Sequence, residues 1–381
     1  MRILAAVAGL ALIVVILIDC FQAMILPRRV VWRWRPARFF YRTAWTFWRA
    51  ASHLLPAGKR RDGFFSIFGP LSLPLLFILW GVSLIVGFAV LHLGLALPLN
   101  PTGEPGDFLT LLYLSGETFF TLGYGDVTAA TPIGRALSVS EAGLGFGFMA
   151  VIIGYLPVLY QAFSRRETVI ALLDARAGSP PTAAQLLLRL GKSRAGVEAA
   201  VPLLAEWERW SAELLESHLS FPVLSYYRSQ HDNQSWLAAL TAMLDVSALL
   251  LTGVEGDVLR YQAQLTFAAA RHAAVDLALT FYTPPLPPQP DRLPADTLQL
   301  LRQELRSAGV SLREGPAVDA KLTELRGLYE PFVNALADFL RFALPPVRPD
   351  KPPVDNWQTS AWMRRAAGFG ELPAADDDHR E

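Results

Sequence analysis

The clearest chemical signal in this chain of 381 residues is one short run between two apolar stretches. It consists of Thr121, Leu122, Gly123, Tyr124, Gly125 and Asp126. Glycine adopts backbone conformations that most side chains forbid, so Gly123 and Gly125 allow successive carbonyl oxygens to point toward one axis. A ring of such oxygens can replace the water around a dehydrated cation, and the Thr121 hydroxyl adds a further oxygen ligand. The pattern therefore predicts cation coordination by the main chain.

The run and its surroundings resemble the potassium-channel pore family, whose filter reads Thr-Val-Gly-Tyr-Gly-Asp. An apolar stretch at 108–120 precedes the run and is too short to cross a bilayer, and a long apolar stretch follows it. The resemblance covers residues 70–165. It implies a short pore helix, a filter loop and an inner helix. K+ would then be coordinated at Thr121, Leu122, Gly123 and Tyr124, with Gly125 completing the filter.

The resemblance also assigns roles to residues around the filter. Glu117 and Asp126 would brace the filter from behind. Gly145 matches the gating-hinge glycine, and Pro157 would bend the lower end of the inner helix. The alternative is that the glycines at 143, 145 and 147 only let helices approach closely, and the two roles can coexist. An apolar cavity would be lined by residues at helical spacing, namely Phe146, Met149 and Ile153.

Two residues depart from the family pattern. Phe120 replaces a threonine and Leu122 replaces valine or isoleucine, and both add bulk behind the filter. Two alternatives to a passive potassium-selective channel therefore stay open. One is a non-selective monovalent cation channel, and the other is a membrane-anchored sensor or scaffold with a vestigial pore. The sequence has no nucleophile–base arrangement and no Cys/His zinc spacing, so we expect no enzyme and no cofactor besides permeant K+ ions.

The composition indicates a membrane protein, because 52% of the residues are hydrophobic and 18% are charged, against about 25% charged in soluble domains. Three stretches can cross a bilayer, at 3–26, 71–93 and 136–163, with Pro70 and Pro74 in the first turns of the second helix. The predicted fold is an all-α membrane protein with three transmembrane helices, a re-entrant pore helix and filter loop, and a helical cytoplasmic domain. One filter loop per chain, where a closed ring needs about four, predicts a homotetramer.

Basic residues predict the orientation in the membrane. Ten of them lie within 27–63 and none within 93–107, and basic loops stay in the cytoplasm. We therefore expect the N-terminus outside and the C-terminal domain in the cytoplasm, in a prokaryotic inner membrane. Aromatic residues alternate with arginines in the segment 28–61, which suits a headgroup anchor or a helix that steers the inner gate. This composition also suits anionic lipid as a partner.

Asp19 is the one charged residue within the stretch 3–26. A charge inside a span is costly, so by default it is a functional feature. The alternative is an acid near the cytoplasmic interface that faces Arg28 or Arg29.

The sequence divides into five expected segments. They are an N-terminal transmembrane helix at 1–26, a basic aromatic segment at 27–63, the pore domain at 64–165, a helical cytoplasmic domain at 166–370 and a disordered acidic tail at 371–381. The 34 basic and 34 acidic residues cancel, which excludes a strongly basic nucleic-acid binder, so no nucleic acid is expected as a partner. The expected partners are further copies of the chain, the lipid bilayer, and a ligand or partner of unknown chemistry for the cytoplasmic domain.

The cytoplasmic domain carries helical patterns. One apolar stripe is formed by Leu203, Trp207, Trp210 and Leu214. A buried core helix is expected at 236–251, and further helices at 264–281 and 322–342. The proline-rich segment 283–294 predicts a stiff, extended linker. The polar and aromatic segment 216–236 is a ligand site, a subunit interface or a satisfied polar layer between helices.

Overall fold

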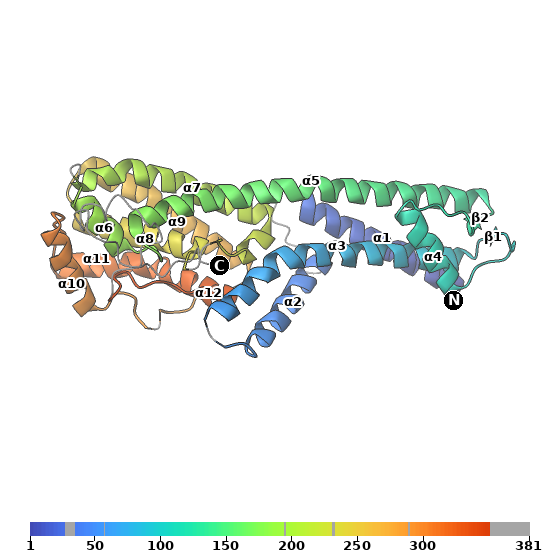
Figure 1. The fold of residues 1–381 in the computed structure, drawn as a ribbon, viewed down its shortest axis with the longest axis horizontal. Coiled ribbons are helices and arrows are strands. Elements are labelled where there is room, and N and C mark those ends of the chain that lie inside the picture. The colour runs from blue at the N-terminus through green and yellow to red at the C-terminus, as the bar shows by residue number, and fades with distance from the viewer. Residues whose placement is uncertain (27–34, 57, 194–195, 231–232, 289, 351–381) are drawn as a thin grey trace, which may run out of the picture. The chain divides into compact units, whose positions relative to one another are not determined.

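The computed structural model describes residues 1–26, 35–56, 58–193, 196–230, 233–288 and 290–350. Residues 28–34 of the basic segment, His231, Asp232 and the predicted acidic tail lie outside these ranges. The all-α prediction is confirmed, because helices dominate the described chain and its two strands have two residues each (Figure 1). The chain divides into two compact units, Met1–Gln161 and Ala162–Glu381. Among the described helices, α1, α3, α5 and α8 are long and apolar enough to cross a membrane.

In the first unit, helices α1 (Arg2–Met24) and α3 (Lys59–Leu95) pack along one another. Their approach is close at Gly94, where an added Cβ would lie 2.2 Å from the backbone nitrogen of Ala6. Apolar side chains of α1 such as Leu4 and Val7 remain exposed in a single chain. An apolar exposed surface on a helix of this length suits contact with lipid.

The start of α3 differs from the sequence prediction. That prediction placed the helix near 71–93 with Pro70 and Pro74 in its first turns, which was wrong, because α3 begins at Lys59 and both prolines lie inside it. A proline inside a helix removes one backbone hydrogen bond. The extension before the prolines offsets this loss by burying Phe65 and Phe68, whose rings pack against a tryptophan of the preceding helix.

That preceding helix, α2 (Pro36–Ser52), has two distinct faces. The Trp45 ring centroid lies 4.7 Å from that of Phe68. Trp48 stacks on Phe64 at 4.4 Å, and its Nε1–H donates to the Phe64 carbonyl at 3.1 Å. Phe39 and Phe47, in contrast, are exposed. One face therefore packs on α3 while exposed aromatic side chains remain elsewhere, a pattern typical of a helix at a membrane surface.

The pore-loop region begins with α4 (Phe108–Phe119), as predicted, and the Asp107 carboxylate caps it by accepting from the Thr110 N–H at 2.8 Å. Helix α5 (Pro132–Ala177) follows as one continuous helix of 46 residues. Strands β1 (Leu99–Asn100) and β2 (Thr128–Ala129) pair antiparallel, with Leu99 opposite Ala129. The sequence did not predict this pairing, which brings the two ends of the loop around α4 together.

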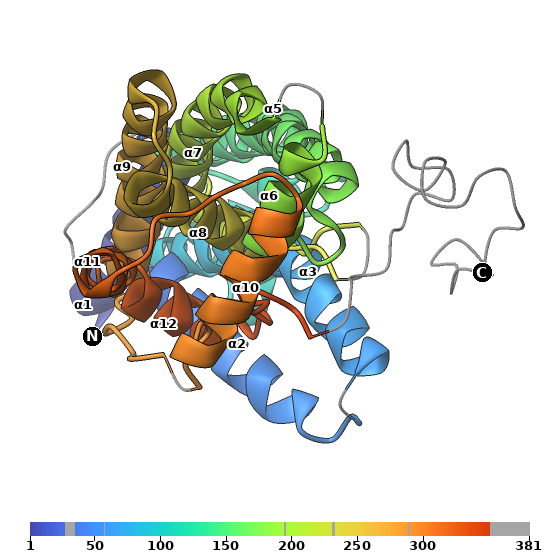
Figure 2. The same cartoon turned by 90° about the vertical axis from the view of Figure 1, so that its left-hand side faces the viewer.

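The second unit is built around α8 (Trp236–Gly253), and 89% of the apolar window of this helix is buried. The prediction of a buried core helix at 236–251 is therefore confirmed. Figure 2 shows α8 among the other helices of the unit. These are α6 (Ala183–Gly191), α7 (Ala200–Ser220), α9 (Asp257–Thr280), α10 (Ala295–Ser307), α11 (Pro316–Gly327) and α12 (Glu330–Leu340), with short 3-10 turns η1 (Gly196–Ala199) and η2 (Pro222–Tyr226).

Two further helical predictions have different outcomes. The predicted stripe on α7 is confirmed, since all four of its side chains are buried, and the helix at 264–281 is confirmed as the greater part of α9. The single helix predicted at 322–342 was wrong, because the chain forms α11 and then α12. Pro331, in the first turn of α12, has no N–H and disfavours a helical residue before it, which favours a break between two helices near this position.

The described part of segment 283–294 has no helix or strand, and Arg292 fixes it to the core. The Arg292 Nη2 lies 2.6 Å from Asp245 Oδ2 on α8, and its Nη1 lies 3.4 Å from Glu330 on α12. The Tyr329 hydroxyl donates to the same aspartate at 2.5 Å. All four side chains are buried. The proline-rich segment is therefore attached to α8 and α12 at Arg292, by buried charges that pair with one another.

Candidate ion pathway

The backbone of the predicted filter alternates between two conformations. Thr121, Gly123 and Gly125 have φ values of 56°, 64° and 79°, while Leu122 and Tyr124 between them do not have positive φ. Every second residue is therefore in the left-handed region, which glycine adopts without cost and other residues rarely adopt. The positive φ values at Gly123 and Gly125 agree with the expectation that glycine is needed at these two positions.

The filter run is exposed in a single chain. Leu122 and Tyr124 are 57% and 71% exposed. Thr121, Gly123 and Gly125 are exposed as well. Irregular backbone at membrane depth is tolerated only when protein covers it or it lines water. One copy of the chain does not supply that cover.

The C-terminal end of α4 is connected directly to this run. The Leu122 N–H donates to the Glu117 carbonyl at 2.8 Å, and the Thr121 N–H donates to the Thr118 carbonyl at 3.1 Å. The Glu117 side chain is buried, and one of its carboxylate oxygens lies within hydrogen-bonding reach of the Tyr124 backbone N–H. The filter backbone is therefore attached to the end of α4 by these bonds.

Asp126 is held by a residue that the sequence analysis missed. Its Oδ1 accepts a hydrogen bond from the Tyr113 hydroxyl at 3.2 Å. Tyr113 lies one helical turn before Glu117, so both side chains lie on one face of α4. This spacing is the signal that could have pointed to Tyr113.

Gly145 lies where α5 crosses the end of α4. A Cβ added at this position would lie 2.0 Å from the Phe119 carbonyl oxygen, so a side chain is excluded. The same construction at Gly143 and Gly147 meets no atom within 4 Å. Helix α5 is continuous through both Gly145 and Pro157 in this conformation. Of the two roles considered for Gly145, the close packing of helices is observed directly.

The predicted cavity-lining residues lie on α5. Phe146, Met149 and Ile153 are 72%, 42% and 67% exposed, and their spacing places them on one stripe of the helix. They form an apolar surface that one chain does not cover.

Two buried polar residues behind the filter were missed. Ser115 of α4 and Glu141 of α5 are both fully buried. Neither residue was assigned a role from the sequence. The Ser115 hydroxyl forms a short hydrogen bond with the Glu141 carboxyl group. Glu141 is the one charged residue within 136–163, and that isolation is the signal that could have singled it out.

Asp19 joins three helices of the first unit. Its Oδ2 accepts from the Ala37 N–H at 2.8 Å and from the Trp80 Nε1–H at 2.9 Å, and its Oδ1 accepts from the Arg35 Nε–H at 3.3 Å. The residue is buried, and it caps the N-terminus of α2 from α1. Arg28 and Arg29, the predicted partners of Asp19, lie outside the described residues.

Comparison with known proteins places the first unit in a family. Residues 75–161 match the family described as Ion channel. Two proteins named Protein LctB, from Geobacillus stearothermophilus and Bacillus caldotenax, are 37% and 36% identical to the chain over an alignment of 95 residues. The match covers 22% of this chain and 70% of each relative. The chain belongs to the ion channel family. No solved structure matches it.

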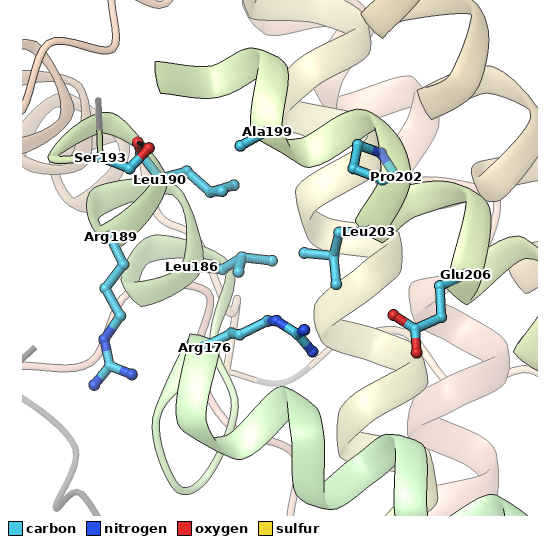
Figure 3. Close-up of a pocket in the computed structure, with 9 residues that line it drawn as sticks. All are labelled: Arg176, Leu186, Arg189, Leu190, Ser193, Ala199, Pro202, Leu203 and Glu206. Atoms are coloured by element: carbon cyan, nitrogen blue, oxygen red, sulfur yellow. Dashed lines mark hydrogen bonds between the residues drawn. The ribbon is translucent and has the colours of Figure 1, made fainter. Parts of the chain in front are cut away.

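The second unit of this ion channel, outside the matched residues, contains a pocket of about 350 Å³ (Figure 3). Its walls are formed by Arg176, Leu186, Arg189, Leu190, Ser193, Ala199, Pro202, Leu203 and Glu206. Arg176, at the end of α5, and Glu206, on α7, extend toward one another across one side of it. Arg189 donates to the Ala175 carbonyl at 2.6 Å and so binds α6 to the last turn of α5. A pocket of this size and mixed lining can accept a small molecule.

The polar segment 216–236 of the channel forms a layer between helices. His218 is fully buried, its Nδ1 lies 2.8 Å from the Leu214 carbonyl, and its Nε2 lies 3.3 Å from Arg166 Nη1. Arg166 also donates to the carbonyls of Leu224 and Tyr227, at 2.9 and 3.0 Å. These groups satisfy one another, which favours the polar layer around His218, while the buried hydroxyl groups of Ser225 and Ser229 have no hydrogen-bond partner within the described residues.

Proposed function

We propose that the protein is a passive potassium channel that conducts K+ through backbone carbonyls of residues 121–125. The observation that carries the proposal is the left-handed backbone at alternate positions Thr121, Gly123 and Gly125, directly after a pore helix. Such a backbone presents oxygen ligands without using charged side chains, which suits a monovalent ion that must bind and leave again. The ion moves down its electrochemical gradient, so no reaction is catalysed and the permeant K+ needs no resident cofactor.

The working unit in this proposal is a homotetramer. One chain contributes one filter strand, and about four are needed to enclose an ion. The exposure of Leu122 and Tyr124, and of Phe146, Met149 and Ile153, supports this assembly, because further copies would cover the first pair and close an apolar cavity around the second group. Closed rotational symmetry is the common arrangement for identical subunits.

The function is tested by flux into liposomes that contain the purified protein. We expect thallium influx and a K+ over Na+ preference, with block by barium. Gly123→Ala should abolish both, because a side chain at φ 64° is strained, by about 1–2 kcal/mol in every copy. Gly63→Ala is the matched control, since an added Cβ there meets no atom within 4 Å and the residue lies far along the chain from the filter.

The same assay separates the two alternatives. Phe120 and Leu122, which add bulk at the filter, favour a non-selective monovalent cation channel as the second candidate. Equal K+ and Na+ permeabilities in the wild-type protein would establish that candidate. No flux in the wild type, together with no effect of Gly123→Ala in cells, would instead support a membrane-anchored sensor or scaffold with a vestigial pore.

We also propose a prokaryotic inner membrane as the location, with the N-terminus outside and the second unit in the cytoplasm. The exposed Phe39 and Phe47 of α2, beside the arginines at 38, 42 and 49, support contact of this helix with anionic lipid headgroups. Orientation is tested with single cysteines in a variant lacking Cys20. An impermeant thiol reagent should label Gly103→Cys in intact cells and Lys192→Cys only after permeabilisation.

A further inference from the structure

Behind the filter, α5 and α4 are joined at two points one helical turn apart. Glu141 and Gly145 lie four residues apart on α5, and Ser115 and Phe119 lie four residues apart on α4. At one point Gly145 contacts the Phe119 carbonyl so closely that no side chain fits. At the other, Glu141 and Ser115 share a short hydrogen bond, and both are fully buried. The second point is a polar bond in an apolar environment, where a missing partner is costly.

The hydrogen atoms available at this bond limit its arrangement. The Ser115 Oγ lies within hydrogen-bonding distance of Glu141 Oε1 and also 2.9 Å from the carbonyl oxygen of Ile85 on α3. A hydroxyl group has one hydrogen, so it can donate to one of these two oxygens only. Both bonds form together if Ser115 donates to Ile85 and Glu141 carries a proton that it donates to Ser115. If Glu141 were ionised, the Ser115 hydroxyl would supply the only hydrogen. Ser115 could then bond either Glu141 Oε1 or the Ile85 carbonyl oxygen, and the other of these two oxygens would receive no hydrogen bond.

The remaining oxygen of Glu141 agrees with a neutral side chain. Oε2 is buried, and within the described chain it has no hydrogen-bond partner. If Glu141 is neutral, Oε2 is a carbonyl oxygen that lacks one hydrogen bond. If Glu141 is ionised, Oε2 belongs to an unpaired buried charge, which costs far more free energy.

We propose that Glu141, protonated, is a positioning residue for the filter. It donates to Ser115, which donates to the Ile85 carbonyl, so that one chain of hydrogen bonds ties the inner helix, the pore helix and α3 together. The inference deepens the proposed function and rests on it, because α4 passes its position to the filter through the Leu122 N–H bond to the Glu117 carbonyl. Glu141 and Ser115 are fully buried within one chain, whereas residues 121–125 of the filter are exposed in it.

The test compares variants of the full-length protein in liposomes by K+ over Na+ permeability ratio and by the dwell time of barium block. Glu141→Leu and Ser115→Ala should each change both readouts by about tenfold, the effect of one lost hydrogen bond. The double variant should change them no more than either single variant, because the same chain is broken. Glu141→Gln should keep the permeability ratio and the barium block of the wild type, since its amide N–H can donate to Ser115 in place of the acid. Ser140→Ala is the matched control, because that exposed hydroxyl bonds only its own helix at the Ala136 carbonyl.

Three results would overturn the inference. The first is an unchanged permeability ratio and block in Ser115→Ala, a small substitution that keeps the proposal testable if Glu141→Leu does not assemble. The second is a Gln variant that behaves like the Leu variant. The third is the absence, from the infrared spectrum of the wild type, of a protonated-carboxyl band that Glu141→Gln removes. Because this band does not depend on conduction, a wild type without flux would refute the proposed function while the protonation of Glu141 is still decided.

Discussion

Gly145 shows how a single absent side chain sets the distance between two helices. The Phe119 carbonyl occupies the place that a Cβ would take, at 2.0 Å. Alanine at this position gains helix propensity of about 1 kcal/mol but forces α5 away from the pore helix, and overpacking of this kind costs about 1–3 kcal/mol. We therefore expect Gly145→Ala to lower the thermal midpoint of the purified protein and reduce ion flux. Gly147→Ala, where the Cβ is free within the chain, should not lower the midpoint.

His218 should make the stability of the second unit depend on pH. Burial, and the charge of Arg166 beside it, hold the pKa of His218 well below its ordinary value. Arg166 can only donate, so the His218 Nε2 accepts and its Nδ1–H donates to the Leu214 carbonyl, which is the neutral ring. At about pH 6.5 the His218 ring takes up a proton in the unfolded chain, whereas in the folded chain it stays neutral. The contribution of His218 to the free energy of unfolding is therefore full above this pH. As the pH decreases further, the contribution decreases by about 1.4 kcal/mol per pH unit.

The measurement is the thermal midpoint of the full-length protein at about pH 7.5 and about pH 5.5. The drop between them should be smaller in His218→Gln than in the wild type. His272→Gln is the matched control, because that ring is 67% exposed and pairs with Asp276 at 3.6 Å on the same helix. Equal drops in the wild type and His218→Gln would show that His218 is not the group that takes up the proton.

At the scale of elements, Asp19 fixes the position of α2. Three donors from two other segments, the N–H groups of Arg35, Ala37 and Trp80, converge on this carboxylate. Asp19→Ala leaves all three without an acceptor in a buried place and should cost about 3 kcal/mol of unfolding free energy. Asp19→Asn retains an acceptor and should cost less. Hydrogen exchange should rise first in α2, while Asp62→Ala, at an exposed acid in the first turn of α3, should change stability by less than about 0.5 kcal/mol. Unchanged exchange in α2 after Asp19→Ala would refute this role.

Continuous patterns along the chain predicted the elements well. The short apolar stretch at 108–120 predicted α4, and the apolar stripe that ends at Leu214 predicted the buried face of α7. Contacts between separate segments were not predicted, because no local pattern encodes which donors meet. The bond of Tyr113 to Asp126, the chain from Glu141 through Ser115, and the pairing of β1 with β2 all depend on how helices pack. The early start of α3 is of the same kind, since packing against α2 outweighs the prolines.

At the scale of the whole molecule, α5 is the covalent connection between the ion channel unit and the second unit. It begins at Pro132 beside the filter loop and ends at Ala177 in the second unit, without a break. Its last turn is bound by Arg189, which also lines the pocket between α6 and α7. Backbone hydrogen bonds fix α5 along most of its length, and Pro157 removes one of them. We therefore expect a change in the pocket to act on the end of the helix that carries the predicted gate.

This connection predicts that filling the pocket changes gating and leaves selectivity alone. Ala199→Trp places a large ring in the cavity of about 350 Å³ and displaces α6 from α7, and with α6 the Arg189 bond to the end of α5. In single-channel recordings the open fraction should shift, while the K+ over Na+ permeability ratio should stay at the wild-type value, because no filter residue lies in the second unit. Ala212→Trp, at an exposed site on α7, the helix that follows Ala199, is the matched control and should match the wild type. If both tryptophan variants open like the wild type, the second unit does not act on the pore through α5.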